Sequence, residues 1–335
     1  MKKTKAFCAG GDVRKVYDAG IESFKKSGTV DRGGVTDAFF REEYWLNYKI
    51  HQLGQQYKGG KGYGQVTFWD GVTMGGGVGL SIHAPFRVCT SQTAFAMPET
   101  AIGLFPDVGG SHWLPRLPHA GMGQYLGLTG RRLNGRECVA VGVGTHFVAE
   151  PVATDKGFTA VDLTTNFLVG GHSQGGSIEE ILAEIEAAAK MAGQSEQGPT
   201  AIEQQFEDIE RAFANKACVE DIVSELLRMN NDFATSTLKD MGKYSPLSMK
   251  VTHEMIKRGG RLDMAGCLEM EFWLTQHFMS QAPTGDFYEG IRALLVDKDN
   301  KPKWNHARLE DVRDEEVMSY FTPIEGVKKW TPEGL

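Results

Sequence analysis

Residues 72 to 117 contain the residue types that could do chemistry. A triple glycine, Gly75 to Gly77, is followed by two acids in apolar loops, Glu99 and Asp107. A glycine turn at the start of a helix exposes N–H groups that can hold an oxygen bearing negative charge. A carboxylate a few turns downstream could be a base, an acid or a nucleophile. Together these features suggest acyl-transfer chemistry rather than a binding patch.

A second glycine turn, Ala9-Gly10-Gly11, shares this context. Each turn is predicted to follow a strand and to start a helix, so Gly11 and Gly76 could each aim an N–H group at one carbonyl oxygen. The alternative is that these glycines only permit tight corners between strand and helix. Spacing alone leaves both interpretations open.

Each candidate acid also has a structural interpretation. Burial of Glu99 behind Pro98 would raise its pKa and suit it to acid–base work, but an acid at a helix start is also favoured by the helix dipole. Asp107 precedes Val-Gly-Gly and could simply be a helix N-cap. Glu42 and Glu43 lie in an aromatic helix, and a solvated face is the alternative to function there.

The basic candidates are fewer. Arg14 is predicted in the first turn of a helix, where its charge opposes the dipole, which suggests an anionic partner; a plain surface arginine is the alternative. His83, His112 and His146 have apolar neighbours but are not spaced as a metal set, so no metal site is predicted.

The elements that must position these residues alternate between strands and helices. A strand ends in the first glycine turn, Asp12 caps a helix over 13–26, and Thr36 caps a long helix up to residue 57. Further predictions are strands at 65–69, 86–90, 93–97 and 145–148, a turn at 70–77 and a helix through Ile82. The Gly-Gly pair after Asp107 is predicted to open further helices up to about residue 142. This order predicts an α/β fold with mostly parallel strands.

Beyond residue 150 the pattern becomes helical. We predict a flexible loop at 170–177, then helices from 178 and around 201–214, 218–229, 245–258, 262–279 (strongly amphipathic) and 286–296, the last followed by a charged turn. The predicted organisation is therefore a core at 1–149, a mostly helical region at 150–321 and a polar, loosely ordered tail at 322–335.

Composition excludes several classes of function. The chain has 335 residues and a net charge of −7, which argues against a general nucleic-acid partner. Its apolar runs are too short to span a bilayer, so no membrane partner is predicted. Five dispersed cysteines without a CxxC motif indicate a reducing compartment. The usual motifs of nucleotide hydrolysis, nicotinamide binding, zinc proteolysis and serine hydrolysis are not found.

Five segments in order resemble the crotonase (enoyl-CoA hydratase/isomerase) superfamily: KAFCAGGDVR, FFREEY, MGGGVGL, MPETAIGLFPDVGG and DFYEGIRALLVDKDNKPKW. The resemblance implies a crotonase-like spiral of ββα units with a helical C-terminal region. It also implies an acyl-CoA thioester as substrate, with no cofactor other than the coenzyme A of that substrate. A homo-oligomer is compatible with it, and a eukaryotic source would imply the mitochondrial matrix, otherwise the cytoplasm.

The resemblance also implies roles for individual residues. Gly11 and Gly76 match the two N–H donors of the oxyanion hole, and Arg14 matches a position that commonly contacts the phosphate region of coenzyme A. Glu99 matches the catalytic glutamate. Asp107 matches the second acid of the hydrolase branch. In that branch Glu43 matches an acid that borders the acyl pocket.

One position separates the branches. Hydratases carry a second catalytic glutamate where this chain has Gly79. We therefore expect hydrolysis of a short-chain hydroxyacyl-CoA thioester. The alternatives are a hydratase or isomerase, and a non-catalytic hydrolase-like subunit of a mitochondrial ribosome. The chain begins inside the family's first glycine motif, so we expect a truncated N-terminus in which the opening strands of relatives, and any targeting segment, lie outside this sequence.

Overall fold

The computed structural model describes residues 6–30, 34–57, 64–148, 178–180, 183 and 198–334. The chain forms two compact units, each assembled from three stretches. The first comprises Met1–Ala9, Lys49–Ala96 and Arg132–Gln205, and the second comprises Gly10–Tyr48, Met97–Arg131 and Phe206–Leu335. The predicted boundary at 149/150 lies outside the described residues and stays a prediction.

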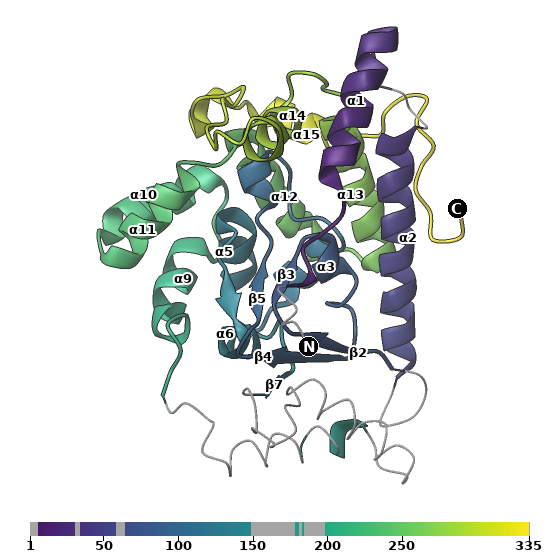
Figure 1. The fold of residues 1–335 in the computed structure, drawn as a ribbon. Coiled ribbons are helices and arrows are strands. Elements are labelled where there is room, and N and C mark those ends of the chain that lie inside the picture. Colours follow the sequence, from purple (N-terminus) through teal and green to yellow (C-terminus); the bar gives the residue numbers. More distant parts are fainter. Residues whose placement is uncertain are drawn as a thin grey trace. The chain divides into compact units, whose positions relative to one another are not determined.

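The described residues of the first unit form two small sheets. One has the order β1-β3-β5-β6 and the other β2-β4-β7. Every strand pair is parallel except β5 with β6, so the predicted α/β class with mostly parallel strands is confirmed. The strands are β1 (Ala6–Cys8), β2 (Val66–Trp69), β3 (Val72–Met74), β4 (Phe86–Thr90), β5 (Ala94–Ala96), β6 (Leu133–Asn134) and β7 (His146–Val148). Figure 1 shows β2 and β4 side by side.

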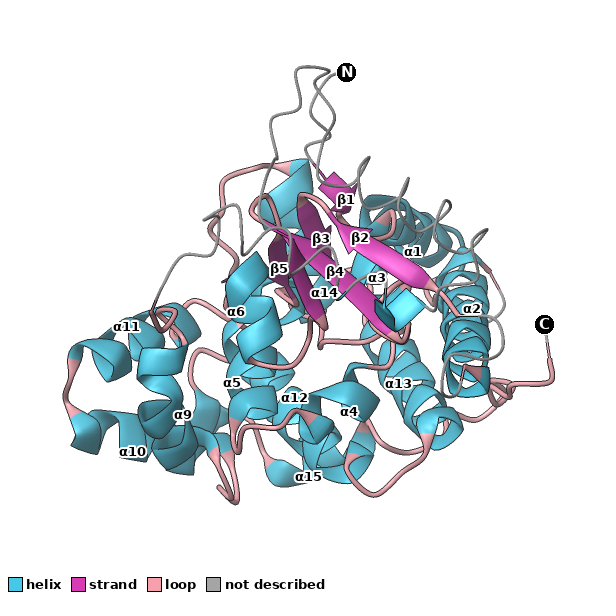
Figure 2. Ribbon diagram, turned by 90° about the horizontal axis from the view of Figure 1, so that it is seen from below, coloured by secondary structure: helices cyan, strands magenta, loops and turns pink. Residues whose placement is uncertain are grey.

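Strand β3 was predicted as part of a turn, and that prediction is wrong. Val72–Met74 pairs with β1 on one side and with β5 on the other, with Thr73 opposite Phe95 (Figure 2). Three residues between glycines are too few to show the period-two pattern of a strand. Strands β4 and β5 follow each other in sequence but lie in different sheets.

The triple glycine joins β3 to the single-turn helix α3 (Gly76–Gly79). Gly75 has a φ of 50°, which a residue with a Cβ rarely adopts. A Cβ on Gly77 would lie 2.2 Å from the carbonyl oxygen of Cys8. The regular helix ends earlier than predicted, although the N–H of Ile82 still donates to Val78 at 2.7 Å. Gly75 and Gly77 therefore permit a tight corner between strand and helix, which is the structural interpretation of this motif.

Apolar side chains of the second sheet form a core in the first unit. Phe86, Val88 and Val148 are buried, and Tyr57 and Val66 pack against them together with Phe68 and Ile178. The helix α6 (Gly135–Ala140) also belongs to this unit and begins with a capping box between Asn134 and Glu137.

The second unit is mostly helical. It contains α1 (Val13–Ser27), the first part of α2 (Val35–Gln56), α4 (Gly110–Trp113), α5 (Met122–Thr129), α9 (Phe206–Phe213), α10 (Val219–Met229), α11 (Asp232–Met241), α12 (Pro246–Gly259), α13 (Met264–Met279), α14 (Asp286–Ile291) and α15 (Asp314–Ser319). The helix α11 was not predicted. Residues 178–180 and 183 are helical, whereas the rest of that predicted helix and the loop at 170–177 lie outside the described residues.

The N-termini of the first two helices differ in how well they were predicted. Asp12 caps α1 as expected, accepting the N–H of Lys15 at 3.0 Å. Thr36 does not cap α2, because that helix already begins at Val35. The carbonyl of Gly34 accepts the N–H groups of Asp37 and Ala38. A threonine is an N-cap only if its backbone is still outside the helix.

The C-terminal segments are more buried than their sequences suggest. Helix α13 was predicted to be strongly amphipathic, but buried residues occupy most of its faces, including Glu271. Trp330, in the predicted polar tail, is 1% exposed and donates from Nε1 to the carbonyl of Arg41 at 3.2 Å. A single large apolar side chain is enough to anchor a polar segment.

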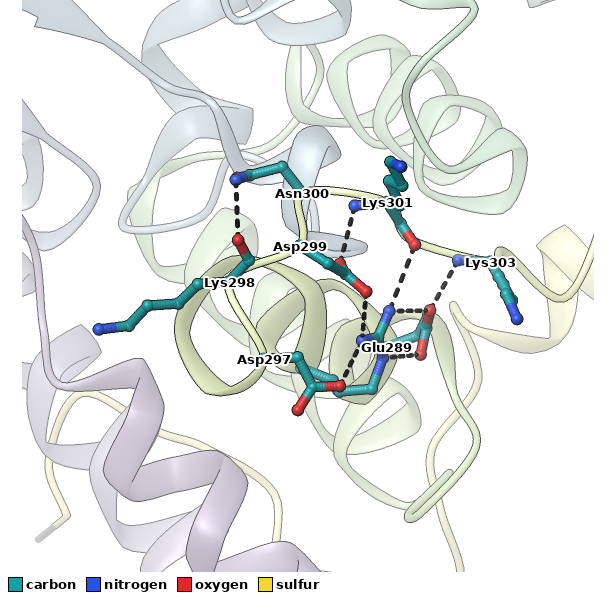
Figure 3. Close-up of polar contacts among 8 residues, drawn as sticks. Glu289, Asp297, Lys298, Asp299, Asn300, Lys301 and Lys303 are labelled. Atoms are coloured by element: carbon teal, nitrogen blue, oxygen red, sulfur yellow. Dashed lines mark hydrogen bonds and ion pairs between the residues drawn. The ribbon is translucent and has the colours of Figure 1, made fainter.

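Polar contacts around Glu289 and Asp299 organise the segment after α14 (Figure 3), and Arg292 is at their centre. Its guanidinium donates to both carboxylate oxygens of Glu289 at 2.8 Å, and it also pairs with Asp297 and Asp299. The Glu289 carboxylate accepts the N–H of Lys303 at 2.7 Å. These contacts fold the predicted charged turn back onto the helix that precedes it.

Candidate active site

Four acidic side chains gather inside the second unit. They come from different elements: Glu43 from α2, Glu99 from the 3₁₀ helix Glu99–Ile102, Asp107 from the loop before α4, and Glu271 from α13. Glu99 and Asp107 are each 6% exposed, and Glu271 is fully buried. The structure thus brings together three predicted site residues and adds Glu271, which the sequence did not single out.

Glu99 combines both interpretations of its sequence context. It is the first residue of a helical turn, and it is also buried. Burial, aided by the charges of Asp107 and Glu43, raises the pKa of Glu99 well above its ordinary value, while a backbone hydrogen bond opposes the shift. Its Oε2 atom has no hydrogen-bond partner among the residues that the structure describes. This buried oxygen therefore has hydrogen-bonding capacity that no described residue uses.

Asp107 is not the N-cap that its sequence context suggested. The cap position of α4 is Gly109, and Asp107 contributes only its backbone carbonyl, which accepts the N–H of Gly110 at 2.8 Å. Its side chain accepts the hydroxyl of Tyr44 at 2.9 Å instead. Burial raises the pKa of Asp107 to about 6, and the Tyr44 donor limits that rise.

The side chain of Glu271, on α13, accepts the capping hydrogen bonds at the start of α4 that were expected for Asp107. Its carboxylate accepts the N–H groups of Gly109 and Ser111, both at 2.8 Å, and the Ser111 hydroxyl at 2.6 Å. Burial raises the pKa of Glu271 to about 8, and the donors from Ser111 and Gly109 oppose that shift. The signal that could have identified it is an acid in the middle of an apolar helix.

Glu43 and Glu42 have different environments. Glu42 is exposed, as a solvated face requires, whereas Glu43 is only partly exposed. Burial and the nearby charge of Asp107 raise the pKa of Glu43 to about 8. The solvated-face interpretation is therefore wrong for Glu43.

Arg14 lies in the first turn of α1. The two candidate oxyanion donors are Gly11, just before α1, and Gly76, the first residue of α3. The anionic neighbour of Arg14 is Asp18, whose carboxylate accepts its Nε at 2.9 Å, and its Nη1 also donates to the carbonyl of Leu295. A Cβ on Gly11 would lie 2.5 Å from the outer end of the Phe39 ring, so this side chain would have to shift to admit any larger residue there. Gly76 belongs to the first unit and Gly11 to the second, so the oxyanion hole stays a prediction.

Both central acids have raised pKa values. Burial raises the pKa of Asp107 to about 6, against the hydroxyl donor of Tyr44. The pKa of Glu99 lies well above its ordinary value, first through burial and then through the charge of Asp107. Buried carboxyl groups with shifted pKa values are typical of acid–base or nucleophilic sites.

We expect Tyr44→Phe to raise the pKa of Asp107 above about 6, because the only change is the loss of a donor to its carboxylate. The free energy of unfolding should fall by about 1 kcal/mol. Titration of ¹³C-labelled aspartate carboxyls by NMR measures the shift, with Tyr48→Phe as the matched control. An unchanged Asp107 titration would show that this hydrogen bond does not form in solution.

Two absences concern only the described part of the chain. No group of three potential metal-ligating side chains occurs there. None of the helices described is both long and apolar enough to cross a membrane.

Comparison with known proteins defines the class to which this fold and site belong. The sequence profile of the enoyl-CoA hydratase/isomerase family matches residues 1–321. The chain belongs to this family, the crotonase superfamily, and the predicted crotonase-like fold with a helical C-terminal region is confirmed.

Similar proteins within the family share one description. The chain is 42% identical over 328 residues to "3-hydroxyisobutyryl-CoA hydrolase, mitochondrial" of Dictyostelium discoideum, covering 97% of this chain and 78% of that protein. The equivalently named protein of Danio rerio is 39% identical, with 96% and 76% covered. These relatives are named as mitochondrial.

Solved structures give the same fold. A structure described as a carnitinyl-CoA dehydratase from Mycobacterium thermoresistibile has a TM-score of 0.75 and 29% identity, covering 99% of this chain and 84% of that one. One described as an enoyl-CoA hydratase from Rhodobacter sphaeroides 2.4.1 has a TM-score of 0.72 and 30% identity, with 96% and 81% covered.

Proposed function

We propose that this protein hydrolyses a short-chain hydroxyacyl-CoA thioester, and specifically 3-hydroxyisobutyryl-CoA to 3-hydroxyisobutyrate and coenzyme A, a step of valine breakdown. The observation that carries the proposal is the buried pair of Glu99 and Asp107. One glutamate oxygen has no hydrogen-bond partner among the described residues, and the aspartate accepts the hydroxyl of Tyr44. The names of the relatives from Dictyostelium discoideum and Danio rerio support the choice of substrate.

The proposed chemistry assigns Glu99 to the thioester carbonyl. Its carboxylate either attacks the carbonyl carbon to give a mixed anhydride or removes a proton from the attacking water. In either case the C–S bond breaks, the thiol of coenzyme A leaves, and water supplies the oxygen and proton of the products. Glu99 must lose its proton first, so the rate should rise with pH through its raised pKa.

The other site residues act on the substrate around this centre. Asp107 orients the substrate hydroxyl or assists proton transfer, and Glu43 borders the acyl group. Arg14 contacts the phosphate region of coenzyme A; its present ion pair with Asp18 is exposed and weak, so a phosphate can replace it. The N–H groups of Gly11 and Gly76 polarise the carbonyl.

We also propose that the reaction needs no separate cofactor, because water and the thioester supply every atom of the products. A mitochondrial matrix location in a eukaryotic source is proposed from the relatives named as mitochondrial. A homo-oligomer stays a prediction.

The test is the release of free coenzyme A from 3-hydroxyisobutyryl-CoA, followed with a thiol reagent. A hydratase or isomerase is the second candidate, because two similar solved structures are described as a dehydratase and a hydratase. We expect thiol release without hydration of crotonyl-CoA, since Gly79 carries no second carboxylate. Hydration without thiol release would establish the second candidate. Co-sedimentation with ribosomes and neither activity would indicate a structural role.

A further inference from the structure

The loop that carries Asp107 has a backbone conformation that needs external support. Val108, fully buried, has a φ of 52°, in the left-handed region that β-branched residues avoid. Such a conformation costs about 1–3 kcal/mol and persists only where the surrounding structure holds it. The next residue, Gly109, is also left-handed, with a φ of 84°.

Glu271 supplies that support from a distant helix. Its carboxylate spans the start of α4, accepting at Oε2 from the N–H of Gly109 and at Oε1 from the N–H and hydroxyl of Ser111. The first N–H groups of a helix have no partner within the helix itself. Glu271 is fully buried, so water does not provide an equivalent set of acceptors.

We propose that Glu271 is a positioning residue that caps α4 in place of Asp107 and thereby leaves the Asp107 carboxylate to Tyr44 and the substrate. The inference rests on the proposed function, in which Asp107 acts on the substrate. Its basis is that the carboxyl groups of Glu271 and Asp107 compete for the N–H groups at the start of α4. An aspartate just before a helix is a strong capping residue, and without Glu271 it would be the nearest carboxylate along the chain to the vacated N–H groups.

The test compares Glu271→Ala, Asp107→Asn and the double variant in the thioester assay. Displacing Asp107 should lower kcat by about 10²-fold. If Glu271 acts through Asp107, the double variant should lose no more activity than Asp107→Asn alone. The charge of Asp107 raises the pKa of Glu99, so both single variants should move the rise of kcat to lower pH.

Two further variants separate positioning from stability. Asp286→Ala removes another fully buried carboxylate, which accepts the Ser245 hydroxyl and the N–H of Asn305. It should lower the melting temperature without moving the pH profile. Glu271→Gln retains one acceptor oxygen, so its loss of kcat should be intermediate. This variant allows the test to be made if Glu271→Ala does not fold.

A readout independent of activity separates this inference from the proposed function. ¹³C NMR should show the Asp107 pKa falling below about 6 in Glu271→Ala or Glu271→Gln, because backbone N–H groups would then donate to its carboxylate. If the parent protein cleaves no thioester but this shift occurs, the proposed function fails and the positioning role stands. An unchanged Asp107 titration, or losses of kcat that multiply in the double variant, would overturn the inference.

Discussion

Replacing Glu99 with glutamine is expected to lower kcat for 3-hydroxyisobutyryl-CoA hydrolysis by about 10³-fold or more. The change keeps the shape of the side chain and removes the only group proposed to attack the carbonyl or activate water. KM should change much less, because binding of coenzyme A does not depend on this carboxylate. Measuring thiol release over a range of substrate concentrations separates the two constants.

The same substitution should leave the protein folded and make it more stable at alkaline pH. The pKa of Glu99 is higher in the folded than in the unfolded protein, so stability that is present at low pH is lost as pH rises through the folded-state value. Glutamine avoids that loss. Retention of activity within a few-fold of the parent would refute the catalytic assignment, and the melting temperature at each pH controls for misfolding.

Replacing Gly77 with alanine is expected to lower the free energy of unfolding by at least about 3 kcal/mol. The new Cβ would lie 2.2 Å from the carbonyl oxygen of Cys8 and 2.8 Å from its carbonyl carbon. Both are backbone atoms of Cys8, the last residue of strand β1, so no side-chain rotation relieves the contact. Chemical denaturation, or the soluble yield if the variant does not fold, measures the loss.

Gly260→Ala is the matched control. Gly260 is exposed, has a φ of −59° and would place its Cβ no closer than 3.6 Å to another atom. Its stability should stay within about 1 kcal/mol of the parent. An equal loss in both variants would mean that close packing at Gly77 is not the reason for its glycine.

Local sequence predicted most elements that have their own start signal and a clear period. Asp12 was identified as the cap of α1, and the long aromatic helix α2 was found, because these signals depend on residues a few positions apart. Strand β3 was missed because it is defined by its two neighbours in the sheet rather than by a pattern of its own. Helix α13 looked amphipathic because a sequence cannot show what covers its polar face.

The candidate site shows the same division more sharply. Glu99 and Asp107 could be selected from their apolar contexts and from the family resemblance. Their raised pKa values could not be predicted, because they depend on burial and on Tyr44 and Glu43 from α2. The capping interpretation of Asp107 failed because Glu271, 160 residues from Ser111 along the chain, occupies that role.

The sequence by itself determined the family, the glycine turns and the acids that could act on a thioester, since these depend on residue type and local order. Only the tertiary structure decided which acid caps α4, which is held by a tyrosine and which has an unpartnered oxygen. The physical reason is that hydrogen bonding and desolvation depend on which groups meet in space, and the groups that decide the state of Asp107 come from helices far away in the chain.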